Sequence, residues 1–212
     1  MKKSHKSVFA MVLAATTFLS VPALAERVLR LDEVAVGELD PALGSDYADS
    51  ILAFNVYDTL VIPVQGGPGM APHLAEKWEG DVTSFTFTLR KDVKFTSGNA
   101  MTANDVVFSF NRMMALGQGN SFLFLDVDKA EAVDAHTVKF TLKAPYSPFI
   151  SSLTRLPIID KAVVMANLST GDGEMKDWGK AYLTSNSAGT GAYKVVSHDP
   201  QNETVMAKNL SY

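Results

Sequence analysis

Residues 85–110 read FTFTLRKDVKFTSGNAMTANDVVFSF and place a strand signal directly before a helix signal. Residues 85–89 alternate strictly between apolar residues and threonine, which predicts a strand with its odd-numbered residues on the apolar face. Thr102 followed by Asp105 is typical of a helix start, because the threonine can cap exposed amides and the aspartate lies near the positive helix end. Apolar residues then recur at helical spacing as far as Gly117, a natural C-cap.

The same two patterns continue on both sides of this stretch. Further strand-like runs lie at residues 27–36, 93–95, 123–127, 137–142, 193–196 and 204–207. Further helices are predicted from Ser45 or Asp46 to Pro63, and over residues 149–153. Glycine-rich or proline-containing segments separate these elements, among them residues 65–69, 169–173 and 188–192. Because strands alternate with at least three helices, the sequence predicts a mixed α/β (α+β) fold.

The first twenty-five residues have the layout of a secretory signal peptide. Three lysines precede a short apolar run, and the small residues Ala23 and Ala25 match the A-x-A cleavage pattern. The sequence therefore predicts cleavage between Ala25 and Glu26, and the run is too short for a membrane-spanning helix. Without a twin-arginine pair, export of the unfolded chain through the Sec route to the periplasm is the expectation.

Charge and cysteine content exclude several classes of function. The chain has 19 Lys and Arg against 23 Asp and Glu, a net charge of −4, and loss of the three signal-peptide lysines makes it −7. Such a chain offers no basic field to nucleic acid. It has no cysteine, which excludes disulfides, thiolate metal sites, cysteine nucleophiles and the lipid-modified cysteine of a lipoprotein.

Residues that could support catalysis or metal binding are scattered. The four histidines, His5, His73, His136 and His198, show no H-x-x-x-H spacing, so no metal site is predicted. The glycines of residues 189–191 lack the lysine of a phosphate loop, and no G-x-S-x-G motif is present. This pattern favours binding without a cofactor over catalysis, with no catalytic residue assigned. An exported hydrolase with a scattered Ser, His and Asp site, or a secreted protein-binding module, stays open.

One pair of carboxylates needs a separate interpretation. Asp126 and Asp128 flank Val127 and would lie on the same face of a strand. Two neighbouring carboxylates can perform acid–base catalysis, but a solvated strand face explains them better. Neither residue is therefore taken as part of a site.

The order of the motifs resembles extracellular solute-binding protein family 5, the peptide- and nickel-type receptors of ABC importers. The stretch from Trp78 to Phe110 is the most specific part of this resemblance, and Ala192 departs from it by replacing the usual proline. The matching segments are Leu39-Asp40-Pro41 and residues 55–60, 72–78, 85–95, 102–110, 137–142, 189–193 and 209–212.

The resemblance implies a bilobal fold like that of type II periplasmic binding proteins, with an extra sub-lobe, of which this chain is the N-terminal portion. Residues 26–65 would then form the first segment of lobe I, residues 66–184 the inserted sub-lobe, and residues 185–212 the resumption of lobe I, truncated before lobe II. The resemblance also implies a monomeric, non-enzymatic receptor that captures an oligopeptide, a dipeptide or a related small solute. Its lobes would close on the solute, and it would deliver the solute to an ABC permease at the inner membrane.

The loop after the first predicted strand is the candidate ligand site, because ligands of α/β lobes bind at strand ends. It comprises Gly37, Glu38 and Leu39. Glu38 could meet a ligand ammonium, although a solvated loop acid is an equal alternative. We also expect residues 26–212 alone to expose apolar surface and to bind ligand poorly.

Overall fold

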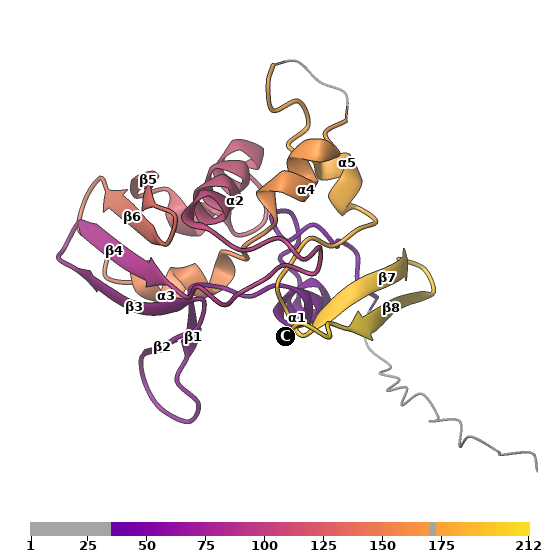
Figure 1. The fold of residues 1–212 in the computed structure, drawn as a ribbon, viewed down its shortest axis with the longest axis horizontal. Coiled ribbons are helices and arrows are strands. Elements are labelled where there is room, and N and C mark those ends of the chain that lie inside the picture. The colour runs from indigo at the N-terminus through magenta and orange to yellow at the C-terminus, as the bar shows by residue number, and fades with distance from the viewer. Residues whose placement is uncertain (1–34, 170–172) are drawn as a thin grey trace, which may run out of the picture. The chain divides into compact units, whose positions relative to one another are not determined.

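The computed structural model describes residues 35–169 and 173–212 (Figure 1). Helices and strands are interspersed along these residues, which confirms the mixed α/β class. The helices are α1 (Tyr47–Val56), α2 (Ala103–Leu116), η1 (Ser121–Phe124), α3 (Phe149–Ser152), η2 (Leu153–Arg155), α4 (Lys161–Ala166) and α5 (Lys180–Leu183). The strands are β1 (Val61–Pro63), β2 (Met70–Pro72), β3 (Ala75–Gly80), β4 (Ser84–Leu89), β5 (Val127–Asp134), β6 (Thr137–Leu142), β7 (Tyr193–Asp199) and β8 (Glu203–Lys208).

Three predicted features lie wholly or partly outside the described residues. The signal peptide with its cleavage site at Ala25 and Glu26 does so entirely, as does most of the predicted strand at 27–36. The predicted loop at 169–173 is described only at its ends. Within the described ranges, no helix combines the length and the apolar character that crossing a membrane requires.

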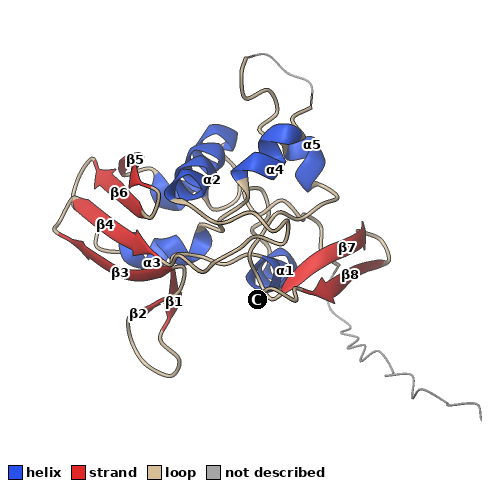
Figure 2. Cartoon of the chain, viewed as in Figure 1, coloured by secondary structure: helices blue, strands red, loops and turns tan. Residues whose placement is uncertain are grey.

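A four-stranded antiparallel sheet of order β3-β4-β6-β5 carries the larger hydrophobic core (Figure 2). Phe87 pairs with Val138 across β4 and β6, so the apolar residues of both strands share one face. Helix α2 packs on β5 and β6, and the Phe110 ring meets the Phe140 ring edge to face at 5.7 Å. The strands predicted at 85–89 and 137–142 are confirmed, with Phe87 and Leu89 fully buried.

Helix α2 begins and ends where the sequence predicts. The Asp105 carboxylate accepts hydrogen bonds from the Thr102 amide at 2.8 Å and from the Thr102 hydroxyl at 2.9 Å. Burial raises the pKa of Asp105, and these donors together with the Lys161 amide oppose that rise. Gly117 ends the helix in the left-handed conformation, with φ of 61°.

Helix α1 begins after Asp46 as predicted, but the predicted end at Pro63 is wrong. The helix stops at Val56, because the Val56 carbonyl accepts a hydrogen bond from Gly191 at 3.0 Å. A Cβ on Gly189 would lie 2.0 Å from that carbonyl oxygen, so the turn needs glycine there. The chain then forms strand β1, which contains Pro63.

Two further strand predictions are corrected. Residues 93–95 do not form a partner strand for β4, which pairs with β3 and β6 instead; they contribute one isolated bridge between Lys94 and Ala100. Residues 123–127 were expected to alternate, yet Phe124 is buried while Phe122 and Leu125 are exposed. That burial has a helical period, and the chain accordingly forms η1 before β5 begins at Val127.

The remaining elements agree with the sequence. Helix α3 lies within the predicted segment 149–153, and the strands predicted at 193–196 and 204–207 are confirmed as β7 and β8, which pair as an antiparallel hairpin. Both hairpin strands pair only with each other among the described residues. Val196, Leu210 and Tyr212 at this end of the chain expose much of their apolar surface.

Candidate functional site

The loop before α1 is held by the first turn of that helix. The Gly37 and Glu38 amides both donate to the Asp49 carboxylate, at 3.0 and 3.1 Å. Asp49 is the acidic residue of the first helical turn, where negative charge is favoured. The predicted site loop is therefore fixed to α1 through its backbone.

A buried ion pair between Asp40 of this loop and Arg112 also holds the loop in place. The Arg112 guanidinium of α2 donates to both carboxylate oxygens of Asp40, from Nη1 at 2.7 Å and from Nη2 through a second bond. Its Nε donates to the Trp178 carbonyl at 2.7 Å, and the Ala42 amide bonds the Asp40 carboxylate at 3.0 Å. Arg112 is 1% exposed and Asp40 is 0% exposed. Burial, and then the Asp40 charge, raise the pKa of the neighbouring Tyr57 hydroxyl.

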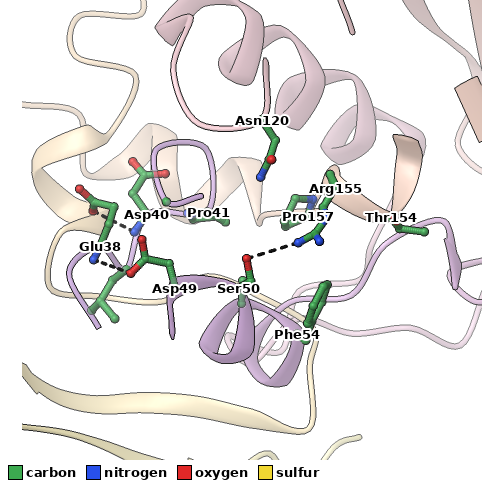
Figure 3. A pocket seen from close by; sticks show the side chains of 13 residues that line it. Glu38, Asp40, Pro41, Asp49, Ser50, Phe54, Asn120, Thr154, Arg155 and Pro157 are labelled. Carbon is green, nitrogen blue, oxygen red and sulfur yellow. Dashed lines mark hydrogen bonds between the residues drawn. The ribbon is translucent and has the colours of Figure 1, made fainter. Parts of the chain in front are cut away.

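A shallow hollow with a cavity volume of about 20 Å³ lies beside this loop (Figure 3). Glu38, Asp40 and Asp49 form one part of its wall. Another part consists of Ser50 and Phe54 from α1, together with Asn120 and Arg155 from the segments around η1 and η2. The hollow thus combines residues from three separate parts of the chain.

The three predicted site residues lie in three different environments. Gly37 is exposed, and Glu38 is half-buried at the wall of the hollow. Leu39 lines the hollow too, but it is only 2% exposed and belongs to the smaller hydrophobic core. Sequence reasoning did not identify Arg155 as part of this hollow, since a single arginine in a short turn carries no motif.

Two of the histidines considered for catalysis or metal binding contact a polar neighbour. His73 Nε2 lies 3.4 Å from the Asp58 carboxylate, and His198 Nδ1 lies 2.9 Å from the Thr204 hydroxyl. His136 belongs to the turn between β5 and β6, and the alternative acid pair at residues 126 and 128 is exposed. Across residues 35–169 and 173–212, no three His, Asp or Glu residues are grouped as metal ligands would be.

A second, more open hollow lies between the start of α2 and the start of α4. The Asp160 carboxylate there accepts from the Ser97 hydroxyl at 2.6 Å, the Asn99 amide group at 2.9 Å and the Val163 backbone at 3.1 Å. Its acids are thus already hydrogen-bonded by the protein itself. The hollow beside Glu38 is the better candidate for binding a solute.

Comparison with known proteins gives the family. The family model described as bacterial extracellular solute-binding proteins, family 5 Middle, matches residues 69–212. The chain is 31% identical to the probable D,D-dipeptide-binding periplasmic protein DdpA of Escherichia coli, over 100% of this chain and 42% of that protein. It therefore spans less than half the length of this relative.

Solved structures agree with this match. The periplasmic binding protein DppA of Helicobacter pylori, in complex with the peptide STSA, aligns with a TM-score of 0.70 and 29% identity. That alignment covers 84% of this chain and 38% of that one. The binding protein MoaA of A. tumefaciens R10, in complex with mannopinic acid, gives 0.70 and 28% over 84% of this chain and 36% of the other. The chain belongs to the bacterial extracellular solute-binding proteins of family 5.

Proposed function

We propose that the protein is the solute-binding component of an ABC importer, which captures a peptide or a related small solute in the periplasm and delivers it to the membrane permease. Membership of a family of solute-binding proteins carries this proposal. The E. coli relative is named for D,D-dipeptide binding, and the H. pylori structure holds a peptide. The structure of MoaA contains mannopinic acid, so the proposed solute class includes small solutes other than peptides.

In this proposal the protein is a monomeric receptor without enzymatic activity and without a nucleic-acid partner. Residues 1–25 direct export, residues 26–65 and 185–212 belong to lobe I, and residues 66–184 form the inserted sub-lobe. A second lobe, following in sequence, closes over the hollow and completes the ligand site. The relative spans more than twice the matched length, which supports this arrangement.

Ligand-dependent stabilisation of the full-length protein tests this function. We expect one class from a panel of di-, tri- and oligopeptides, opine-like acids and metal chelates to raise the melting temperature. A ligand at 100 times its Kd stabilises the folded state by about 2.7 kcal/mol. If no member of the panel raises the melting temperature, the proposal is contradicted. If the protein hydrolyses a member of the panel, the alternative of an exported hydrolase is favoured.

Within the site, Gly37, Glu38 and Leu39 have separate roles. Gly37 lies outside the lining of the hollow and ties the loop to α1 through its amide, and Leu39 anchors the loop in the core. The Glu38 carboxylate accepts the Asp40 amide at 3.1 Å and forms no ion pair with a described residue. It is therefore available to a positively charged group of the solute.

Replacing Glu38 by glutamine is expected to weaken binding of an ammonium-bearing solute about tenfold, because a charge-assisted hydrogen bond becomes a neutral one. Titration calorimetry of the full-length protein measures this loss. Glu131→Gln is the matched control, since Glu131 forms an exposed ion pair with Lys129 at 3.0 Å in β5. If the Glu38 variant and the control bind the solute with equal affinity, Glu38 is a solvated loop acid that does not contact the solute.

A further inference from the structure

The Glu38 carboxylate is placed by its own loop. It accepts a hydrogen bond from the Asp40 amide at 3.1 Å, and the Glu38 amide donates to Asp49 at 3.1 Å (Figure 3). The bond to Asp49 fixes the Glu38 backbone, but the position of the side chain depends on the backbone of Asp40. The contacts that hold Asp40 therefore determine where the Glu38 carboxylate lies at the wall of the hollow.

Asp40 is held mainly through its buried side chain. Its carboxylate accepts the two bonds from Arg112 and the bond from the Ala42 amide. Its carbonyl accepts two further amides of the same turn, each at 3.0 Å. Within the part of the chain that the structure describes, Arg112 is the one ion-pair partner of Asp40. The turn at residues 40–44 is thus built around this ion pair.

Arg112 is itself anchored at a second point. Its Nε donates to the Trp178 carbonyl at 2.7 Å, and the Trp178 ring packs on Phe108 of α2 with 6.0 Å between ring centres. The Trp178 backbone has φ of 56°, a left-handed conformation that is uncommon for a residue other than glycine. The Asp177 carboxylate holds this turn through hydrogen bonds from two backbone amides that follow it, at 3.0 and 2.9 Å. The guanidinium therefore joins Asp40 to a turn that is fixed independently.

The ion pair is better suited to orienting the loop than to stabilising the fold. Because taking two charges out of water costs free energy, a buried ion pair usually contributes little net stability compared with an apolar pair of the same size. Its geometry is specific, because the planar guanidinium fork fits one orientation of the carboxylate. Lysine would keep the charge but could not form the two parallel bonds and the Nε bond together.

We propose that Arg112 is a positioning residue of the solute site, which acts through Asp40 to hold the Glu38 carboxylate where a positive group of the solute binds. This inference rests on the proposed function, because it concerns the same hollow. Arg112 is 1% exposed, and no residue of α2 lines the hollow, so Arg112 acts on the solute only through the loop. Recognition of an ammonium group then depends on an element that does not touch the solute.

A double-mutant cycle between residues 112 and 38 tests this role by titration calorimetry of the full-length protein, below the melting temperature of every variant. The probes are alanine peptides of two to five residues, which carry an ammonium group, and their N-acetylated forms, which do not. We expect Arg112→Lys to weaken binding of the tightest-binding peptide about tenfold, because Glu38 loses its placement. In the Glu38→Gln background, the same substitution should change the affinity by less than about twofold. An acetylated peptide should bind the wild type and Arg112→Lys equally.

Arg90→Lys is the matched control and should leave the affinity unchanged, because Arg90 pairs with Asp92 at 3.0 Å on an exposed surface. Melting temperatures verify that each variant is folded. If Arg112→Lys does not fold, Arg112→Met/Asp40→Asn replaces it in the cycle, since that variant leaves no buried charge unpaired.

Two results of the cycle would overturn the positioning role. If Arg112→Lys binds the peptide as tightly as the wild type, the ion pair is only structural. If the loss is the same in both Glu38 backgrounds, the substitution disturbs the site as a whole. If the wild type binds no alanine peptide but binds another solute of the wider panel, the positioning role alone is overturned. If it binds no solute at all, the proposed function is overturned with it.

Discussion

Replacement of Arg112 by methionine is expected to lower the free energy of unfolding by about 3–5 kcal/mol. The substitution leaves the Asp40 carboxylate, 0% exposed, without its counter-charge, and leaves the Trp178 carbonyl without the Nε donor. Urea denaturation of the full-length protein, followed by fluorescence and circular dichroism, measures the change in unfolding free energy. No other single ion pair among the described residues is as deeply buried.

The double variant Arg112→Met/Asp40→Asn separates the ion pair from simple packing. Asparagine can still accept the Ala42 amide but carries no charge, so the double variant should be clearly more stable than Arg112→Met alone. Arg90→Met is the surface control and should cost about 0–1 kcal/mol. A loss in Arg112→Met no larger than in Arg90→Met would show that the pair contributes nothing specific.

Phe140→Ala is expected to destabilise the larger core by about 3–5 kcal/mol. Phe140 is fully buried, and its ring meets Phe87 at 5.8 Å, Phe110 at 5.7 Å and Phe149 at 5.5 Å between ring centres. The truncation would leave a cavity shared by the sheet, α2 and α3. The same denaturation experiment measures the loss.

Phe122→Ala is the control for this truncation, because Phe122 is 63% exposed in η1. Its removal should change the unfolding free energy by less than about 0.5 kcal/mol. Similar losses in both variants would mean that the sheet and α2 do not share a tightly packed core.

The elements that the sequence predicts correctly are those whose burial follows from local pattern. Strand β4 and helix α2 carry strict periodicity, and α2 also has its capping residues Thr102 and Gly117. The errors arise where a distant segment decides the local structure. Helix α1 ends at Val56 because Gly191 bonds its carbonyl, and nothing near residue 56 signals that bond.

The same distinction applies to the site. The loop at Glu38 can be proposed as a ligand site from the sequence, because it follows a strand pattern and ligands favour strand ends, and its binding role stays a prediction. The role of Asp40 is not predictable, since its partner Arg112 lies 72 residues away. Arg155 joins the hollow only through its contacts with Ser50, 105 residues away, and Phe54. Such contacts emerge only from the three-dimensional packing.

The contacts around the end of α1 also set the order in which the chain can fold. The Thr190 hydroxyl bonds the Asp58 carboxylate at 2.7 Å across 132 residues, and Gly191 caps the same region. Long-range contacts of this kind slow folding, because a large loop must close before they form. During synthesis, the contacts of Val56 and Asp58 with residues 190–191 can form only after residues 190–191 have left the ribosome. For a chain exported as proposed, these contacts therefore complete the end of α1 only after residues 190–191 have been synthesised.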